Sequence, residues 1–197
     1  MSSESDLAIA LGPVVAELNR RGVLYYVGGS IASSFHGAGR STMDVDVATE
    51  LDESAAVELV KSLSREYYGS EVAACDAVRR RSCFNLIHLG TSLKIDIFIS
   101  RGRDFDRSVL RRTVTESLGG NEPFTARIAS AEDIILIKLE WYRLGGEISE
   151  RQWGDVTRVA RLYGSRLDRE YMQHWSRELG VHDLLVRLLQ EVDSSPP

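Results

Sequence analysis

The stretch V-G-G-S-I-A-S-S-F-H-G-A-G-R-S-T-M-D-V-D-V, residues 27–47, places a glycine turn before a pair of carboxylates. The apolar run at residues 23–27 is typical of a buried strand, and Gly28, Gly29 and Ser30 follow it directly. The small residues after Ser30 favour a short helix. Backbone amides at such a strand-to-helix turn attract phosphate, and glycine allows the phosphate to approach closely. The turn is therefore a candidate phosphate site.

The carboxylate pair lies in a second strand-like run, residues 43–48, where Asp44 and Asp46 alternate with Val45 and Val47. Side chains two residues apart on a strand share a face, so the aspartates project together while the valines enter the core. Two like charges this close repel each other, and a bound cation is the usual way to stabilise them. The pair is therefore a candidate metal site.

A third carboxylate, Asp96, lies in a later strand. The runs at residues 83–89 and 93–99 are separated by a short Gly-Thr-Ser loop, which predicts a hairpin. Aspartate is depleted in strands, so Asp96 within K-I-D-I-F-I indicates a functional role. If this strand lies beside residues 43–48, three carboxylates converge. Such oxygen ligands suit Mg²⁺, and the arrangement fits transfer of a nucleotidyl group from an NTP.

The remaining pattern predicts an α+β first half and a helical second half. Residues 7–20 have apolar side chains at helical spacing, and a further helix is expected from residue 52. Residues 100–124 are expected to form a polar connection. Beyond it every signal is helical, and Ser130 and Ser149 are typical of helix starts. We expect domains at residues 1–124 and 125–197.

Composition places the chain among globular proteins. Its 197 residues are 43% hydrophobic and 27% charged, with a net charge of −5. No apolar window is long enough to span a membrane, and the polar start lacks the order of a signal peptide, so we expect no membrane association and a cytoplasmic protein. Cys75 and Cys83 are expected to be reduced thiols.

The net charge hides a basic segment at residues 79–112, which holds nine Lys or Arg residues against three acids, a local charge of +6. Such charge could steer a polyanion such as RNA to a neighbouring phosphate site. A solvated arginine-rich surface without a partner is the alternative.

The motif at residues 27–47 resembles the signature of the nucleotidyltransferase (polymerase beta-like) superfamily, with 13 residues between Ser30 and Asp44. The form S-T-M-D-V-D is similar to that of abortive-infection-type toxin nucleotidyltransferases and their uncharacterised relatives. The resemblance implies a nucleotidyltransferase-fold mixed sheet with flanking helices, followed by a helical C-terminal region. It also implies an NTP substrate and Mg²⁺ as cofactor.

The resemblance assigns roles to single residues. Phosphate contacts fall on Gly28, Gly29 and Ser30. Metal ligation falls on Asp44, Asp46 and Asp96, and Asp96 would also activate the acceptor hydroxyl.

The resemblance extends to two positions beyond this signature. Lys138, in D-I-I-L-I-K-L-E-W-Y-R, and Asp155, in R-Q-W-G-D-V, match a lysine and an acid of the relatives. Lys138 could neutralise triphosphate charge, or its ammonium could simply extend to solvent from a helix. Arg40 and Thr42 could contact phosphate or base, or could stabilise a turn.

The function expected is Mg²⁺-dependent transfer of a nucleoside monophosphate from an NTP to a hydroxyl. Acceptors that remain open are RNA, which the local charge favours, protein hydroxyls and small molecules such as aminoglycosides. A toxin would have an antitoxin protein as partner. Two rivals remain: a non-catalytic nucleotide-binding or regulatory protein of the same fold, and a structural interaction module whose acidic pair is merely exposed.

Overall fold

The computed structural model describes residues 4–38, 44–119 and 123–194. The chain divides into two compact units, one comprising Met1–Ile31 with Ser41–Ala129 and the other Ala32–Arg40 with Ser130–Pro197. This division differs from the expected boundary after residue 124. The strand Phe124–Ile128 pairs within the sheet of the first unit, so the second unit resumes only at Ser130.

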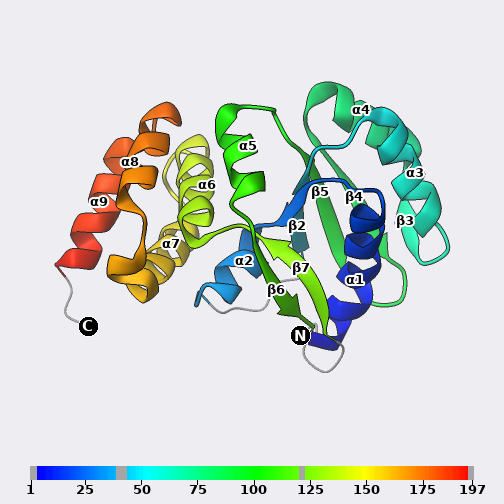
Figure 1. Cartoon of the computed structure of the whole chain (residues 1–197), viewed down its shortest axis with the longest axis horizontal. Coiled ribbons are helices and arrows are strands. Elements are labelled where there is room, and N and C mark those ends of the chain that lie inside the picture. The colour runs from blue at the N-terminus through cyan, green and yellow to red at the C-terminus, as the bar shows by residue number, and fades with distance from the viewer. Residues whose placement is uncertain (1–3, 39–43, 120–122, 195–197) are drawn as a thin grey trace. The chain divides into compact units, whose positions relative to one another are not determined.

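The first unit contains a seven-stranded mixed sheet within the described residues, in the order β3-β4-β5-β2-β1-β7-β6. The pairs β2–β5 and β1–β7 are parallel, and the other neighbours are antiparallel. This sheet with its flanking helices confirms the predicted α+β class (Figure 1). The strands are β1 (Tyr25–Val27), β2 (Asp44–Thr49), β3 (Tyr67–Gly69), β4 (Cys83–His88), β5 (Lys94–Ile99), β6 (Val114–Leu118) and β7 (Phe124–Ile128). The helices are α1 (Glu4–Arg20), α3 (Glu53–Leu63), α4 (Glu71–Arg80) and α5 (Asp104–Arg111), while α2 (Gly29–Phe35) begins in this unit and ends in the other.

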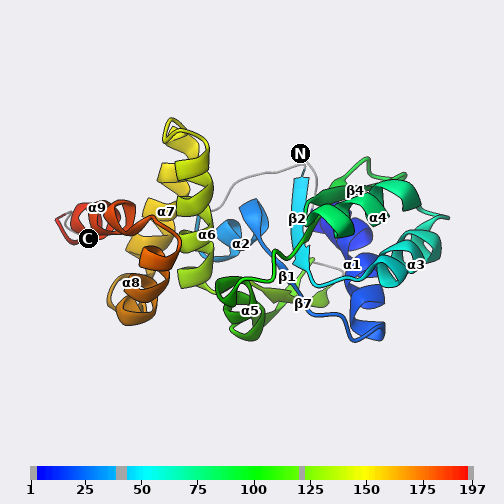
Figure 2. The same cartoon turned by 90° about the horizontal axis from the view of Figure 1, so that it is seen from above.

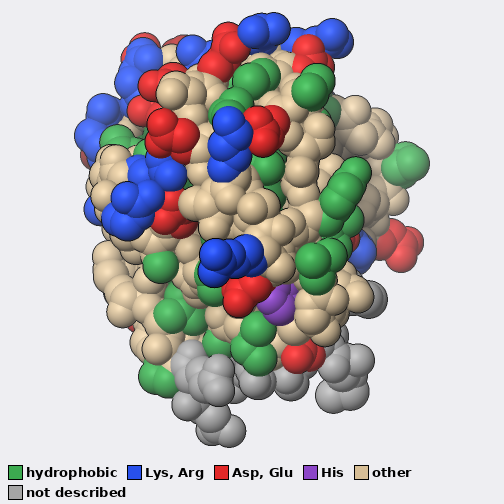
Figure 3. Space-filling view, turned by 90° about the vertical axis from the view of Figure 1, so that its right-hand side faces the viewer, with side chains coloured by type: hydrophobic (Ala, Val, Ile, Leu, Met, Phe, Trp, Pro, Cys, Tyr) green, Lys and Arg blue, Asp and Glu red, His purple; other side chains and the backbone are tan. Residues whose placement is uncertain are grey.

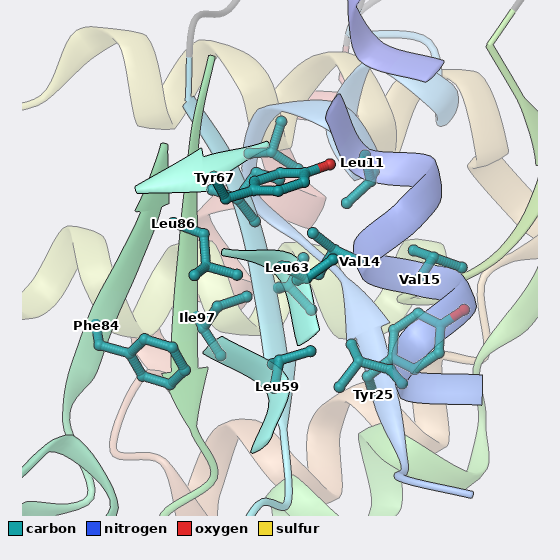
Figure 4. Close-up of a cluster of buried hydrophobic side chains, with 14 of the residues drawn as sticks. Leu11, Val14, Val15, Tyr25, Leu59, Leu63, Tyr67, Phe84, Leu86 and Ile97 are labelled. Carbon is teal, nitrogen blue, oxygen red and sulfur yellow. The ribbon is translucent and has the colours of Figure 1, made fainter. Parts of the chain in front are cut away.

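One face of the sheet packs against α1, α3 and α4 and forms the main core. Figures 1 and 2 show α1 and α3 next to each other beside the sheet. Leu11 and Val14 of α1 and Leu59 of α3 meet Leu86 of β4 and Ile97 of β5 in this core (Figure 4). Every one of these side chains is buried, and burial of apolar area is the main force that stabilises such a layer.

The second unit is helical. Its elements are the end of α2, α6 (Ala131–Leu144), α7 (Glu150–Tyr163), a 3₁₀ turn (Gly164–Arg166), α8 (Arg169–Glu178) and α9 (His182–Asp193). The predicted helix starts are confirmed, because Ser130 and Ser149 each accept a hydrogen bond from the backbone N–H three residues on. Helix α6 packs against α7, α8 and α9.

The prediction that residues 100–124 form a polar connection is wrong. This segment contains α5, which buries Phe105 and Val109, and the edge strand β6. Both elements look polar in the sequence because α5 is short and charged and because an edge strand leaves alternate side chains exposed. Among the helices of the described ranges, none has the length and apolar character needed to cross a membrane.

Candidate functional site

The convergence of the three carboxylates requires that the strands of Asp46 and Asp96 lie side by side, and they do. Strands β2 and β5 are parallel neighbours, with Asp46 opposite Asp96 and Asp44 opposite Lys94. Residues that alternate with these, such as Val45 and Val47, belong to the core on the other face. The three aspartates therefore share the sheet face that does not pack against α1 and α3.

Lys94 links two of the three carboxylates. Its Nζ lies 2.9 Å from Oδ2 of Asp96 and 3.4 Å from Oδ1 of Asp44. The hydrogen bond to Asp96 is the main reason that the pKa of Lys94 is raised, and the charge of Asp44 adds to it. Asp96 is buried and Asp44 is exposed, so the cluster extends from inside the protein to its surface.

Asn85 holds the other oxygen of Asp96. It lies opposite Asp96 on β4, and its Nδ2 donates a hydrogen bond to Asp96 Oδ1. Both carboxylate oxygens of Asp96 are thus engaged by side chains of the neighbouring strand and of its own strand. Sequence reasoning missed Asn85 and Lys94 as site residues. The period-two alternation put Lys94 on the face of Asp96, but nothing local indicated the register of β4.

The glycine turn lies directly against Asp46. Gly29 has a φ of +54°, and a Cβ built on it would lie 1.6 Å from Asp46 Oδ2, so no larger residue fits without displacing that carboxylate. The Gly28 N–H donates to the Asp46 carbonyl oxygen at 2.9 Å. This amide is therefore used by the sheet. Phosphate contacts at Gly29 and Ser30 stay a prediction.

The donor chemistry of the cluster fits a hard divalent cation, since all three ligands offered are carboxylates. Within residues 4–38, 44–119 and 123–194, however, no group of three or more His, Cys, Asp or Glu side chains is arranged to hold a metal ion. The Lys94 ammonium already bridges two of these carboxylates, those of Asp44 and Asp96. A side-chain cation therefore lies between two of the three predicted metal ligands.

Cys83 lies near the same cluster on β4. Burial, with smaller contributions from the charges of Asp96 and Asp46, raises the pKa of its thiol to about 12. Such a thiol stays protonated and is a poor nucleophile. Cys75 and Cys83 are both unbridged, as the composition predicted.

Lys138 and Asp155 pair with each other in the second unit. Lys138 Nζ lies 2.8 Å from Asp155 Oδ2, and Arg158 lies 3.2 Å from the other oxygen. The Lys138 side chain is 11% exposed and that of Asp155 only 1%. The role of this pair in nucleotide binding stays a prediction. Arg40 and Thr42 lie outside the described residues.

Several arginines of the basic segment form ion pairs. Within it, Arg103 pairs with Asp106 and Arg107 with Asp104. Arg79 and Arg80 pair with acids of α3 and α4, at 2.7 and 2.9 Å. On the face drawn in Figure 3, Lys and Arg side chains lie beside Asp and Glu. The pairs inside the segment are already counted in the local charge of +6, whereas the pairs of Arg79 and Arg80 with acids outside it lower the positive charge that a polyanion would meet.

Several aromatic side chains of the second unit pack against each other or against arginine. The Arg187 guanidinium lies 4.2 Å from the Trp153 ring centroid, and the indole N–H of Trp153 donates to Glu191. Trp153 and Arg187 line a pocket of about 530 Å³, together with Tyr142 and Arg161. One face of the indole is covered by arginine, which agrees with a packing role.

Comparisons with known proteins agree with this architecture. A scan against models of protein families finds no match, and a search of curated proteins finds no significant match. Solved structures are similar, including an antigenic nucleotidyltransferase-like protein from Paracoccidioides brasiliensis, with 15% identity and a TM-score of 0.55 over 96% of this chain and 94% of that one. The antibiotic-resistance factor ANT(2'')-Ia has 13% identity and a TM-score of 0.55, over 94% of this chain and 97% of its own.

A second structure of ANT(2'')-Ia, in complex with adenylyl-2''-tobramycin, has 13% identity and a TM-score of 0.52. It covers 87% of this chain and 97% of its own. At such low identity these likenesses establish the fold. The chain has the nucleotidyltransferase fold, as the motif at residues 27–47 predicted.

Proposed function

We propose that the protein is a nucleotidyltransferase that moves a nucleoside monophosphate from an NTP to a hydroxyl acceptor, with Mg²⁺ as cofactor. The observation that carries the proposal is the register that sets Asp46 opposite Asp96, with Gly29 against the Asp46 carboxylate. This contact supports the proposal, because a metal-ligating carboxylate and a phosphate-binding backbone have to lie side by side in such an enzyme. A structural interaction module would not need a glycine at this contact.

In this proposal Asp44, Asp46 and Asp96 hold Mg²⁺, which when bound neutralises phosphate charge and polarises the group that is transferred. Gly29 and Ser30 bind the phosphates through their backbone, and the absence of a Cβ at Gly29 lets the phosphate lie near Asp46. Asp96 accepts the proton of the attacking hydroxyl. The acceptor oxygen then forms a bond to the α-phosphorus as pyrophosphate leaves.

Calorimetric titration of each NTP with and without Mg²⁺ tests the nucleotide site. We expect Mg²⁺-dependent binding in the wild type and a loss of at least about tenfold in the Asp44→Asn/Asp46→Asn variant, because two of three metal ligands lose their charge. A non-catalytic nucleotide-binding protein would also bind but would release no pyrophosphate. Absence of NTP binding both with and without Mg²⁺ would refute the nucleotidyltransferase and the non-catalytic nucleotide-binding protein alike.

Gly29→Ala is expected to weaken Mg²⁺-dependent NTP binding by at least about tenfold, because the new Cβ meets the Asp46 carboxylate. Gly22→Ala is the matched control. Gly22 also has a positive φ, +67°, but nothing lies within 4 Å of its would-be Cβ. Both variants carry the backbone strain, so equal NTP binding by the two would show that the contact with Asp46 has no functional weight.

For the acceptor, RNA is the first candidate, and a toxin acting on RNA would have an antitoxin protein as partner. The ion pairs of Arg79 and Arg80 with acids outside the basic segment weaken the charge argument for RNA. A small molecule such as an aminoglycoside is supported as the alternative by ANT(2'')-Ia, whose structure contains adenylyl-2''-tobramycin. Incubation with α-labelled ATP and either an RNA pool or aminoglycosides separates them, since label appears only in the true acceptor class.

A further inference from the structure

Lys94 has a position that the proposed reaction does not explain. Its ammonium lies between two carboxylates that the proposed function assigns to metal, 2.9 Å from Asp96 and 3.4 Å from Asp44. A divalent cation and this ammonium would repel each other strongly at such distances. Both cannot be held by the same two carboxylates at once, so a metal that binds there has to replace the lysine.

We propose that Lys94 is the resident counter-ion of this site: it holds Asp44 and Asp96 in the metal-free protein and gives up both when a divalent cation binds. The inference rests on the proposed function, because it needs the metal site. Lysine suits this exchange, since its ammonium is a compact charge on a flexible four-carbon stem. The Lys94 side chain is 39% exposed, so its ammonium can move into solvent when it releases the two carboxylates.

Asn85 complements this exchange as a positioning residue. Its uncharged amide donates to Oδ1 of Asp96, whereas Lys94 takes Oδ2. An amide does not repel a cation, so Asn85 can keep the Asp96 carboxylate oriented in both states. The oxygen that Lys94 releases is then the one presented to the metal.

The need to displace Lys94 lowers the affinity of the site for a divalent cation. A cation that binds three carboxylates without a neighbouring ammonium gains more Coulomb energy than one that has to displace a charged side chain. We therefore expect that the wild type binds a bare divalent ion more weakly than a variant without the ammonium.

Titration with Mn²⁺ alone, followed by the loss of the free-ion electron paramagnetic resonance signal, tests the inference without any enzymatic assay. Mn²⁺ prefers the same oxygen ligands as Mg²⁺. We expect Lys94→Met to bind Mn²⁺ on the order of tenfold more tightly than the wild type. Without metal, Lys94→Met should unfold at a lower temperature, because Asp44 and Asp96 then lose the ammonium that pairs with both.

Two further variants keep the test decisive. Lys94→Arg retains the charge and should bind Mn²⁺ no more tightly than the wild type, and it covers the case in which Lys94→Met does not fold. Lys61→Met removes a lysine from an exposed pair with Glu71 and should leave Mn²⁺ binding unchanged. Tighter binding by Lys94→Arg, or unchanged or weaker binding by Lys94→Met, would overturn the counter-ion role while leaving the metal site in place. No Mn²⁺ binding by any variant would instead overturn the metal site itself.

Discussion

Asp96→Asn is expected to lower nucleotidyl transfer by about 10²- to 10⁴-fold, the range that a general base contributes, while NTP binding stays measurable. Asparagine has a similar shape but cannot accept the proton of the attacking hydroxyl. Asp96 is buried opposite Asp46, and Asn85 and Lys94 hold its two oxygens, so the carboxylate has a defined orientation. The measurement is the turnover rate at saturating NTP with the acceptor that the labelling experiment identifies, beside the calorimetric affinity for NTP.

Asp104→Asn is the matched control for this experiment. Asp104 lies in the same part of the chain, is exposed and pairs with Arg107 on the surface. The same chemical change there should leave turnover within about twofold, because exposed ion pairs contribute little. If Asp96→Asn kept turnover within about threefold of the wild type, Asp96 would not be the base, and its role would reduce to metal ligation or to the stability of the sheet.

The local features of residues 27–47 could be predicted because each depends on a short stretch of chain. The alternation of Val45 and Val47 with aspartates predicted strand β2, and the structure has β2 at Asp44–Thr49. Glycine after a buried strand predicted a tight turn, and Gly29 indeed has a positive φ. Period-two geometry needs no knowledge of distant residues.

The register between strands could not be predicted in the same way. The contact between Asp46 and Asp96 depends on β2 and β5, which are about fifty residues apart in sequence and pair in parallel. Asn85 reaches Asp96 only because β4 pairs with β5 in one register, and a shift of one residue would have turned its side chain to the core. The roles of Asn85 and Lys94 therefore emerge from tertiary structure.

The edge strand β6 shows a second limit of prediction from the sequence. Strand β6 has the sequence V-T-E-S-L and no buried side chain, so hydrophobic patterning does not distinguish it from a loop. Its pairing with β7 also moves the end of the first unit past residue 124. Patterns predict elements that bury an apolar face, and they miss elements whose stability comes from backbone hydrogen bonds to a neighbour.

Lys138→Met is expected to lower the free energy of unfolding by about 3 kcal/mol, because it removes the ammonium that pairs with the buried Asp155. Arg158 remains at 3.2 Å from the other oxygen, but this guanidinium is mostly exposed, so it compensates only in part. The loss corresponds to a fall in the unfolding midpoint of about 6–12 °C for a chain of this size. Chemical denaturation followed by circular dichroism measures it through the helices that the second unit contributes.

Two companions separate the charge effect from simple loss of packing. Lys138→Met/Asp155→Asn removes both charges, and it should recover most of the lost stability, since a neutral pair has no buried charge to solvate. Lys61→Met, from an exposed pair at 3.5 Å, should change the free energy of unfolding by less than about 1 kcal/mol. If Lys138→Met were as stable as the wild type, the pair would contribute nothing to the fold. The lysine and the acid would then owe their place to the nucleotide, as the resemblance of the sequence implies.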